Sequence, residues 1–361
     1  MLAISNHSLM LGGGEYSFLD LLTHLPLKWN VLALLPAEGE LGDRLRKKWI
    51  RTHVIPLPSI RPWYAPNILL SLSAYFNLCR RYPPALIYAN GSRAALYGGI
   101  IGRFMRIPVI WHCRIANRDN YLDHILTRFC RYIIVNSQAT AKRFGPTLPS
   151  KIRLVYNGVD IQWLREEGVT TPDSIQASEK IILVLARASR WKRHDLALTA
   201  FEKVASQQHK AHLFCVGDID CADTEWWEFL QEKTARSPFS DRIHWIGQVD
   251  DVRPWLRAAS LLLLASENEP FGRVLVEAMA CGVPVVASRS GGVPEIVRDG
   301  KDGILVEPGK AKLIAKAIST VLEDDDLRRR LSVSAIEQAK LFTIDAHVKK
   351  MVQVFDETVG K

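Results

Sequence analysis

The stretch LLLLASENEPFGRVLVEAMACGVPVVAS (261–288) holds two short apolar runs with a helical segment between them. The runs at 261–266 and 283–288 have the length of buried strands, and a strand covered on both faces is continuously apolar. Residues 273–281 show helical spacing and stop at Gly282, a residue type that commonly ends helices. A strand, a helix and another strand in this order predict a parallel sheet covered by helices.

The rest of the chain repeats this alternation, with helical spacing in segments such as 14–25 and 194–207. Further apolar runs of strand length lie at 31–36, 85–90, 109–113, 132–137, 181–186, 212–217 and 243–247. The pattern predicts an α/β protein that contains two doubly wound parallel sheets.

A polar stretch at 161–180, with Pro172 inside it, separates the two sets of strands. We therefore predict an N-terminal domain at 1–160 and a C-terminal domain at 177–340. The last segment, 341–361, is helix-like with no strand after it. It is expected to pack against one of the two domains, and a return to the N-terminal domain is one arrangement. Because ligands bind beyond the carboxyl ends of strands in such sheets, we expect the site in the cleft between two facing domains.

The composition is that of an ordinary globular protein: 361 residues, 48% of them hydrophobic, and a mean hydropathy near zero. No apolar run approaches the roughly 18 residues of a membrane-spanning helix. The first residues lack the basic start and cleavage site of a secretory signal, so we expect a cytoplasmic protein. The six cysteines are scattered without metal-ligand spacing, which is typical of reduced side chains.

The net charge of +9 is concentrated in residues 1–160, which hold 20 Lys and Arg against 8 Asp and Glu. In the stretch 41–70, cations and aromatic residues are interleaved: Arg44, Arg46, Lys47, Lys48, Arg51 and Arg61 beside Trp49, Trp63 and Tyr64. This pattern favours binding to the anionic inner face of a membrane, where a lipid-linked acceptor would lie. A basic helix face that only keeps the protein soluble is the alternative. No nucleic-acid motif accompanies the stretch, so no nucleic-acid partner is expected.

The loop between the strand and the helix of 261–288 carries groups that suit a sugar nucleotide. The carboxylate of Glu269 lies in the loop and can accept hydrogen bonds from sugar hydroxyls, and Glu277, inside the helix, can accept them from a ribose diol. Backbone amides at the start of a helix are free donors that suit a diphosphate. Here these amides would belong to Phe271, Gly272 and Arg273.

Glu269 and Glu277 stand in an E-x7-E arrangement that resembles the family 4 retaining glycosyltransferases, which have the GT-B fold of two facing Rossmann-like domains. Further matches follow in the family's order along nearly the whole chain. They are Gly12-Gly13-Gly14-Glu15, Trp111-His112, Tyr156-Asn157-Gly158-Val159-Asp160, and the pair Arg187 and Lys192. The family usually has glycine at the positions of Ala186 and Arg193, where this chain departs from its pattern.

The resemblance implies a role for each matching residue. Arg187 and Lys192 would stabilise the charge on the leaving diphosphate, and His112 would contact the donor sugar near the reacting carbon. Glycines in the first domain would let its backbone approach the phosphates. The predicted catalytic residues are His112, Arg187, Lys192 and Glu269. The predicted donor-binding residues are Gly13, Gly14, Arg187, Lys192, Glu269, Phe271, Gly272, Arg273 and Glu277.

The implied reaction transfers a sugar from a UDP- or GDP-sugar to a hydroxyl of a glycan or lipid-linked acceptor with retention, as in polysaccharide biosynthesis. No cofactor and no metal are expected, because Arg187, Lys192 and a helix terminus can offset the developing charge. Asp218-Ile219-Asp220 has the D-x-D pattern that binds metal in another glycosyltransferase fold, but this motif is short and common. A sugar-nucleotide epimerase and a non-catalytic binding protein are the alternatives.

Overall fold

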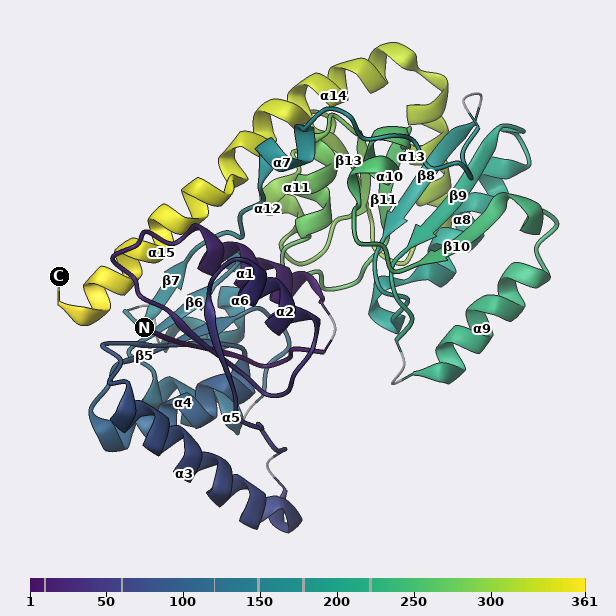
Figure 1. Cartoon of the computed structure of the whole chain (residues 1–361). Coiled ribbons are helices and arrows are strands. Elements are labelled where there is room, and N and C mark those ends of the chain that lie inside the picture. Colours follow the sequence, from purple (N-terminus) through teal and green to yellow (C-terminus); the bar gives the residue numbers. More distant parts are fainter. Residues whose placement is uncertain are drawn as a thin grey trace. The chain divides into compact units, whose positions relative to one another are not determined.

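The computed structural model describes residues 1–9, 11–59, 61–119, 121–147, 150–176, 179–220 and 223–360. The chain forms two compact units (Figure 1). Unit 1 comprises Met1–Val159 together with Ile344–Lys361, and unit 2 comprises Asp160–Thr343. The final helix therefore belongs to the first unit.

Unit 1 is built on a parallel sheet with the strand order β3-β2-β1-β4-β5-β6-β7. Its strands are β1 (Leu2–Ser5), β2 (Leu32–Leu35), β3 (Arg51–Val54), β4 (Ile87–Asn90), β5 (Val109–Cys113), β6 (Tyr132–Val135) and β7 (Ile152–Leu154). Its helices are α1 (Gly13–His24), α2 (Glu40–Lys47), η1 (Pro62–Tyr64), α3 (Ala65–Arg81), α4 (Ser92–Met105), α5 (Leu122–Phe129), α6 (Gln138–Ala141), η2 (Lys142–Thr147) and α15 (Ile344–Val359).

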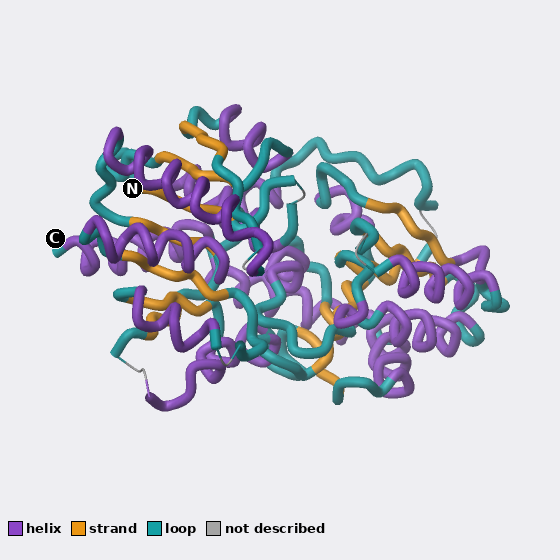
Figure 2. The backbone as a smooth tube through the Cα atoms, turned by 90° about the horizontal axis from the view of Figure 1, so that it is seen from below, coloured by secondary structure: helices purple, strands orange, loops and turns teal. Residues whose placement is uncertain are grey.

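Helices cover both faces of this sheet (Figure 2). The core on one face includes side chains of α1, α2 and α15, and the core on the other face includes side chains of α3, α4 and α5. Successive strand residues point to opposite faces, so Ile110 of β5 packs in the first core and Trp111 packs in the second. Continuous burial along the central strands follows from this arrangement.

Unit 2 has the strand order β10-β9-β8-β11-β12-β13, with parallel pairing throughout. Its strands are β8 (Lys180–Leu185), β9 (Ala211–Val216), β10 (Ile243–Gly247), β11 (Leu261–Leu264), β12 (Val285–Ser288) and β13 (Gly303–Val306). Its helices are α7 (Ile161–Arg165), η3 (Arg190–Lys192), α8 (His194–Ala205), α9 (Thr224–Ala235), η4 (Ser240–Arg242), α10 (Arg253–Ala258), α11 (Arg273–Ala280), α12 (Val293–Ile296), α13 (Ala311–Glu323), α14 (Asp325–Ala339) and η5 (Lys340–Phe342).

The structure confirms the two doubly wound parallel sheets, and every predicted strand lies within two residues of an observed one. Four strands were not predicted: β1, β3, β7 and β13. The last three are edge strands, and β3 illustrates the reason. Its residues alternate between exposed and half-buried, so a polar sequence, Arg-Thr-His-Val, occupies it and gives no apolar run.

The polar stretch at 161–180 is partly ordered. Its first residues form α7, where Arg165 Nε donates a hydrogen bond to the carbonyl of Ala280 at 2.8 Å. Cys281 Sγ also contacts the Leu164 carbonyl at 3.8 Å. These bonds attach α7 to the end of α11 in unit 2. Residues 177 and 178 lie outside the described part of the chain.

The basic stretch at 41–70 does not form one surface. Leu41 and Leu45 of α2 pack in the core beside α1 and α15, whereas α3 packs on the opposite face of the sheet. The two α2 arginines are also paired: Arg44 with Glu40 at 2.6 Å, and Arg46 with Glu38 and Asp43 at 2.8 Å each. The stretch is therefore divided between two sides of unit 1.

Among the described residues, no helix combines the length and the apolar character that crossing a membrane requires. The five described cysteines are unpaired, and Cys221 lies outside the described residues. Burial raises the pKa of the Cys113 thiol to about 11 and that of Cys130 to about 12. These thiols are therefore protonated at neutral pH.

Phe355 of α15 should be a main support of unit 1. Its ring is fully buried and lies 5.3 Å from the ring of Trp29 and 5.6 Å from that of Tyr88. We expect Phe355→Ala to destabilise unit 1 by about 3–5 kcal/mol. Amide hydrogen exchange should then accelerate in β4 and β5 and stay unchanged in β11 and β12.

The matched control is Val333→Ala on α14, because the Val333 side chain is 63% exposed. This variant should leave exchange in both sheets unchanged. Faster exchange in β11 and β12 of Phe355→Ala, with β4 and β5 still protected, would contradict the assignment of α15 to unit 1.

Candidate active site

The strand order of unit 2 reverses beside β8, which pairs with β9 on one side and with β11 on the other. The loops that follow β8 and β11 both leave the carboxyl ends of their strands. They then lead to helices on opposite faces of the sheet. Such a switch point is where open α/β sheets bind ligands. Most of the predicted donor-site residues of unit 2 lie on these two loops, 186–193 and 265–272.

Lys192 and Glu269 join the two loops through an ion pair, with Lys192 Nζ 2.7 Å from Glu269 Oε2. Both side chains are largely buried, at 15% and 8% exposed. A backbone hydrogen bond from the Glu267 amide to the Trp191 carbonyl, 2.9 Å long, runs beside this pair. Arg193 also contacts the Glu267 carboxylate. The sequence placed Lys192 and Glu269 in one site, and the structure brings them into direct contact.

The loop that follows β12 closes on the same glutamate. The Gly292 amide donates to the Glu269 carbonyl at 2.8 Å. Gly291 has a φ of +55°, and a Cβ at this position would lie 2.0 Å from the Glu269 carbonyl oxygen. Only glycine fits such a close approach of two backbones. The position of Glu269 is therefore determined by loops from three neighbouring strands.

The helix that carries Glu277 begins directly after this loop. Gly272 precedes α11 in a left-handed conformation with φ +93°. Arg273 Nε donates to Glu277 Oε1 at 2.7 Å, and both side chains are mostly buried. Phe271 is buried against Phe342, with ring centroids 5.9 Å apart. The Phe271 side chain is therefore part of the core, and only its backbone could meet a ligand.

Arg187 and Arg193 differ from Lys192 in their surroundings. The Arg187 side chain is exposed and makes no ion pair with any residue that the structure describes. Arg193 has a φ of +56°, a left-handed conformation that an arginine adopts at some cost. This conformation explains why a related sequence would have glycine at the position. The ion pairs of Arg193 with Asp195 and Glu267 help to hold it there.

The Asp218-Ile219-Asp220 motif continues the sheet. The Ala188 amide donates to the Asp218 carbonyl at 2.8 Å, and Ala188 and Ile219 form a parallel bridge. Asp218 Oδ1 accepts a hydrogen bond from the Ile219 amide at 2.8 Å. Across the described residues, no group of three His, Cys, Asp or Glu side chains is arranged to hold a metal ion.

In unit 1 the switch point lies between β1 and β4. Asn6, after β1, accepts a hydrogen bond from the Ala94 amide of α4 at 2.7 Å. Asn90, at the end of β4, donates to the Gly14 carbonyl at 3.4 Å. Gly13 and Gly14 are the first residues of α1, so the predicted glycine loop lies at the switch point of this unit.

Arg114 lies beside these groups and was not predicted. Its Nε donates to Asn90 Oδ1 at 2.9 Å, and its Nη1 donates to Asn157 Oδ1. Its Nη2 lies 3.2 Å from Nδ1 of His112. The sequence offered one indication of Arg114 as a site residue, which is its position: it is two residues after His112 and directly follows the same strand. Asn157 belongs to the matching segment 156–160, and the structure adds its contact with Arg114.

His112 is fully buried at the end of β5, with the Tyr88 hydroxyl 2.7 Å from its Nδ1. An arginine side chain has donors and no acceptor, so the contact with Arg114 requires Nδ1 to be an unprotonated acceptor. The ring is then neutral with its proton on Nε2. Burial, together with the nearby Arg114 and His347, holds the pKa of His112 well below its usual value. Nε2 is buried and has no hydrogen-bond partner among the described residues.

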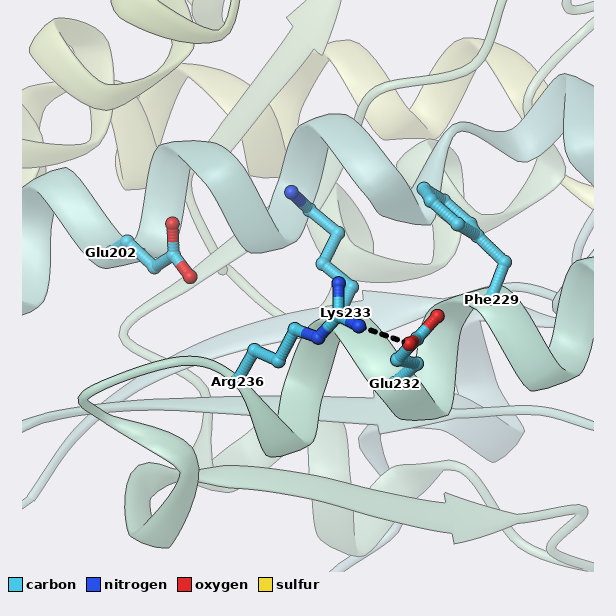
Figure 3. A pocket seen from close by; sticks show the side chains of 5 residues that line it. All are labelled: Glu202, Phe229, Glu232, Lys233 and Arg236. Carbon is cyan, nitrogen blue, oxygen red and sulfur yellow. Dashed lines mark hydrogen bonds and ion pairs between the residues drawn. The ribbon is translucent and has the colours of Figure 1, made fainter.

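A surface pocket of about 270 Å³ lies between α8 and α9 of unit 2 (Figure 3). Its lining residues are Glu202, Phe229, Glu232, Lys233 and Arg236, and Arg236 pairs with Glu232. None of them follows the carboxyl end of a strand. We therefore place the functional site at the switch point of unit 2 and not in this pocket.

Replacing Lys192 by methionine should leave the buried Glu269 carboxylate without its partner. We expect Lys192→Met to lower the free energy of unfolding by about 3–5 kcal/mol, and the additional change Glu269→Gln to recover part of this loss. Urea unfolding measures both effects. Lys203→Met on the exposed side of α8 is the control and should change stability by less than about 0.5 kcal/mol. Equal stability of Lys192→Met and the control would show that the pair does not hold the loops.

The protonation state of His112 can be tested by nitrogen-15 NMR of the ring. At pH 7 we expect Nε2 to carry the proton and Nδ1 to carry none. Arg114→Met removes the donor cation and should raise the pKa of His112, whereas Arg118→Met, an exposed arginine on the same loop, should not. A proton on Nδ1 of the unaltered protein would refute the assignment.

Two family models match the chain over most of its length. The model of the glycosyl transferases group 1 matches residues 172–338, and the model of glycosyltransferase family 4 matches residues 11–163. The first match falls within unit 2, and the second covers most of unit 1.

Curated relatives match part of the chain. It is 35% identical over 193 residues to N-acetyl-alpha-D-glucosaminyl L-malate synthase of Bacillus anthracis, an alignment that covers 52% of this chain and 49% of the relative. It is 29% identical over 223 residues to D-inositol 3-phosphate glycosyltransferase of a Nocardioides species, with 57% and 48% covered. The chain thus spans about half the length of the curated relatives it matches.

Among solved structures, that of Anabaena HepE in complex with UDP-glucose matches with a TM-score of 0.86 and 25% sequence identity, over 99% of both chains. The two family models, one on each unit, and this similarity along the whole chain agree with the E-x7-E arrangement and the switch-point geometry. The chain belongs to the family 4 glycosyltransferases of the GT-B fold.

Proposed function

We propose that the protein transfers a sugar from a nucleotide diphosphate sugar to a hydroxyl acceptor, with retention of the anomeric configuration. The contact between Lys192 and Glu269 carries this proposal. A diphosphate that reaches the switch point offers Lys192 a stronger anionic partner than one carboxylate. Glu269 would then be free to accept hydrogen bonds from the hydroxyls of the sugar. Donor binding would thus exchange one ion pair for two specific contacts.

The other donor contacts follow from α11. The start of this helix favours negative charge, so the diphosphate would lie near the amides of Gly272 and Arg273. Glu277 uses one carboxylate oxygen for Arg273, and the other would accept the ribose diol. Arg187, exposed after β8, would add a second cation to the phosphates. Side-chain charges and the helix terminus would stabilise the leaving group, so we propose that no metal ion is needed.

For the donor we favour UDP-sugars over GDP-sugars, because the matching HepE structure contains UDP-glucose. The acceptor would be a hydroxyl of a glycan or lipid-linked precursor, as in polysaccharide assembly. His112, a neutral ring with its proton on Nε2, would donate a hydrogen bond to the donor sugar. The leaving phosphate would take the proton of the acceptor hydroxyl, and no nucleophilic side chain would be required.

A direct assay separates this proposal from its alternatives. The protein is incubated with UDP-glucose or GDP-mannose, with and without a panel of glycan acceptors and with a chelator in parallel. Acceptor-dependent release of the nucleotide and an unchanged anomeric configuration in the NMR spectrum of the product support retaining transfer. Epimerised donor without acceptor would identify an epimerase, and binding without turnover would identify a binding protein. Loss of transfer with the chelator would contradict the metal-independent mechanism.

Removal of either charged contact should impair transfer. Glu277→Ala and Lys192→Ala should each lower kcat/KM at least about tenfold, because each removes a charge-assisted contact to the nucleotide. Glu228→Ala and Lys203→Ala, at exposed positions on α9 and α8, are matched controls and should retain full activity. Near wild-type rates for both site variants would refute the donor site.

A further inference from the structure

A long part of unit 1 contains no acidic residue. Between Asp43 and Asp119 the sequence holds 13 Lys and Arg and no Asp or Glu. This segment includes α3 and α4, which form one helical layer of the unit. The opposite layer contains acidic residues on α1, α2 and α15. Three of the 13 cations, Arg44, Arg46 and Lys47, belong to α2 in the opposite layer. What distinguishes the α3–α4 side is that its two helices carry arginines and no carboxylate.

The cations of this side are not neutralised by neighbours. Arg93 of α4 is half-buried and donates a hydrogen bond to the Leu57 carbonyl. Within the part of the chain that the structure describes, the five other arginines of α3, α4 and the turns beside them make no ion pair, and they are exposed. They are Arg61, Arg80, Arg81, Arg103 and Arg106. Arg61 lies over the ring of Trp63, with 5.5 Å between its guanidinium carbon and the ring centroid. By contrast, Arg44 and Arg46 on the opposite side are paired with carboxylates.

α3 also exposes large apolar side chains at its first turns. Its inner face packs through Ser71, Tyr75, Leu78 and Cys79. Its outer face carries Leu69 and Leu70, which are 68% and 70% exposed, and Trp63 precedes the helix with 68% exposed. Figure 1 shows α3 as the outermost helix of its layer, beside α4. Leucines exposed to this extent next to a tryptophan are unfavourable in water unless another apolar phase covers them.

We propose that the α3–α4 side of unit 1 docks on an anionic lipid bilayer, with Trp63, Leu69 and Leu70 inserted among the headgroups and acyl chains. We call these three residues the α3 tip. The arginines of this side would contact anionic headgroups, each contributing electrostatic attraction within about a Debye length of the surface. Tryptophan is enriched at the level of the headgroups, where one part of its ring is apolar and one part is polar.

The apolar tip favours a membrane over a nucleic acid as the partner. Phosphate backbones are bound by cations alone or by cations with aromatic rings that stack on bases. Two adjacent exposed leucines contribute to neither interaction. Insertion into a bilayer, by contrast, transfers both leucine side chains out of water. The surface is also distinct from the donor site of unit 2, so its role does not depend on glycosyl transfer.

Vesicle flotation of the full chain tests the proposal. We expect salt-sensitive binding to vesicles of phosphatidylcholine with phosphatidylglycerol and little binding to phosphatidylcholine alone. The pair Leu69→Ser and Leu70→Ser should weaken partitioning at least about tenfold, since each leucine loses its transfer into the apolar phase. Leu341→Ser and Val333→Ser, at 65% and 63% exposed in unit 2, are the matched controls and should bind as the unaltered protein does.

The charge contribution is tested separately. Arg80→Gln with Arg81→Gln should reduce the salt-sensitive part of binding, whereas Lys312→Gln with Lys316→Gln on α13 should not. Wild-type binding by the leucine pair, or no binding of the unaltered protein to anionic vesicles at low salt, would overturn the proposal. Tighter binding to single-stranded RNA than to vesicles, unaffected by the leucine changes, would assign the surface to nucleic acid instead. Transfer to a water-soluble acceptor should be unchanged in every variant of the α3 tip.

Discussion

The ion pair between Lys192 and Glu269 is the contact on which the proposed donor site of unit 2 depends. It connects the loops after β8 and β11 at 2.7 Å, where the strand order reverses. The loop after β12 holds the same glutamate through its backbone, with Gly291 pressed against it. A buried pair of this kind adds little net stability, because desolvation offsets attraction, but breaking it is costly. Its contribution is therefore to position: it holds a cation and an anion next to each other at the switch point, where the proposed donor would meet both.

The switch point of unit 1 is organised by a cation as well. Arg114 contacts Asn90 at the end of β4, His112 near the end of β5 and Asn157 after β7. Because arginine only donates, it also determines the protonation state of His112. Both units thus have a partly or largely buried cation at the carboxyl ends of their strands. The consequence of this cation differs between the units. In unit 2 the proposed function has the cation exchange its partner for a phosphate, and in unit 1 the cation requires one tautomer of a histidine.

The sequence predicts those elements of the fold that have a regular hydrophobic pattern. Buried strands such as β5 and β11 are continuous apolar runs, and α11 has clear spacing and a glycine at each end, so fold class and the loop with Glu269 follow directly. The edge strands β3, β7 and β13 were not predicted, and β3 shows the reason: alternate side chains of Arg51–Val54 are exposed to solvent, so its sequence is polar. The sequence also does not predict contacts between distant residues. The pairing of Lys192 with Glu269 and the contacts of Arg114 depend on which strands are neighbours in the sheet. The composition of 41–70 could not show that its segments pack on two faces of a sheet, because composition carries no information about the side on which a segment packs.

The central claim is that Glu269 holds the transferred sugar while the rest of the site holds the nucleotide. Calorimetric titration of UDP and UDP-glucose into the unaltered protein and Glu269→Gln tests it most directly. The account predicts that Glu269→Gln weakens UDP-glucose at least about tenfold, by loss of charged hydrogen bonds to hydroxyls, and changes the affinity for UDP much less. An equal loss of affinity for both ligands would contradict it, because Glu269 would then act on the nucleotide or on the fold and not on the sugar.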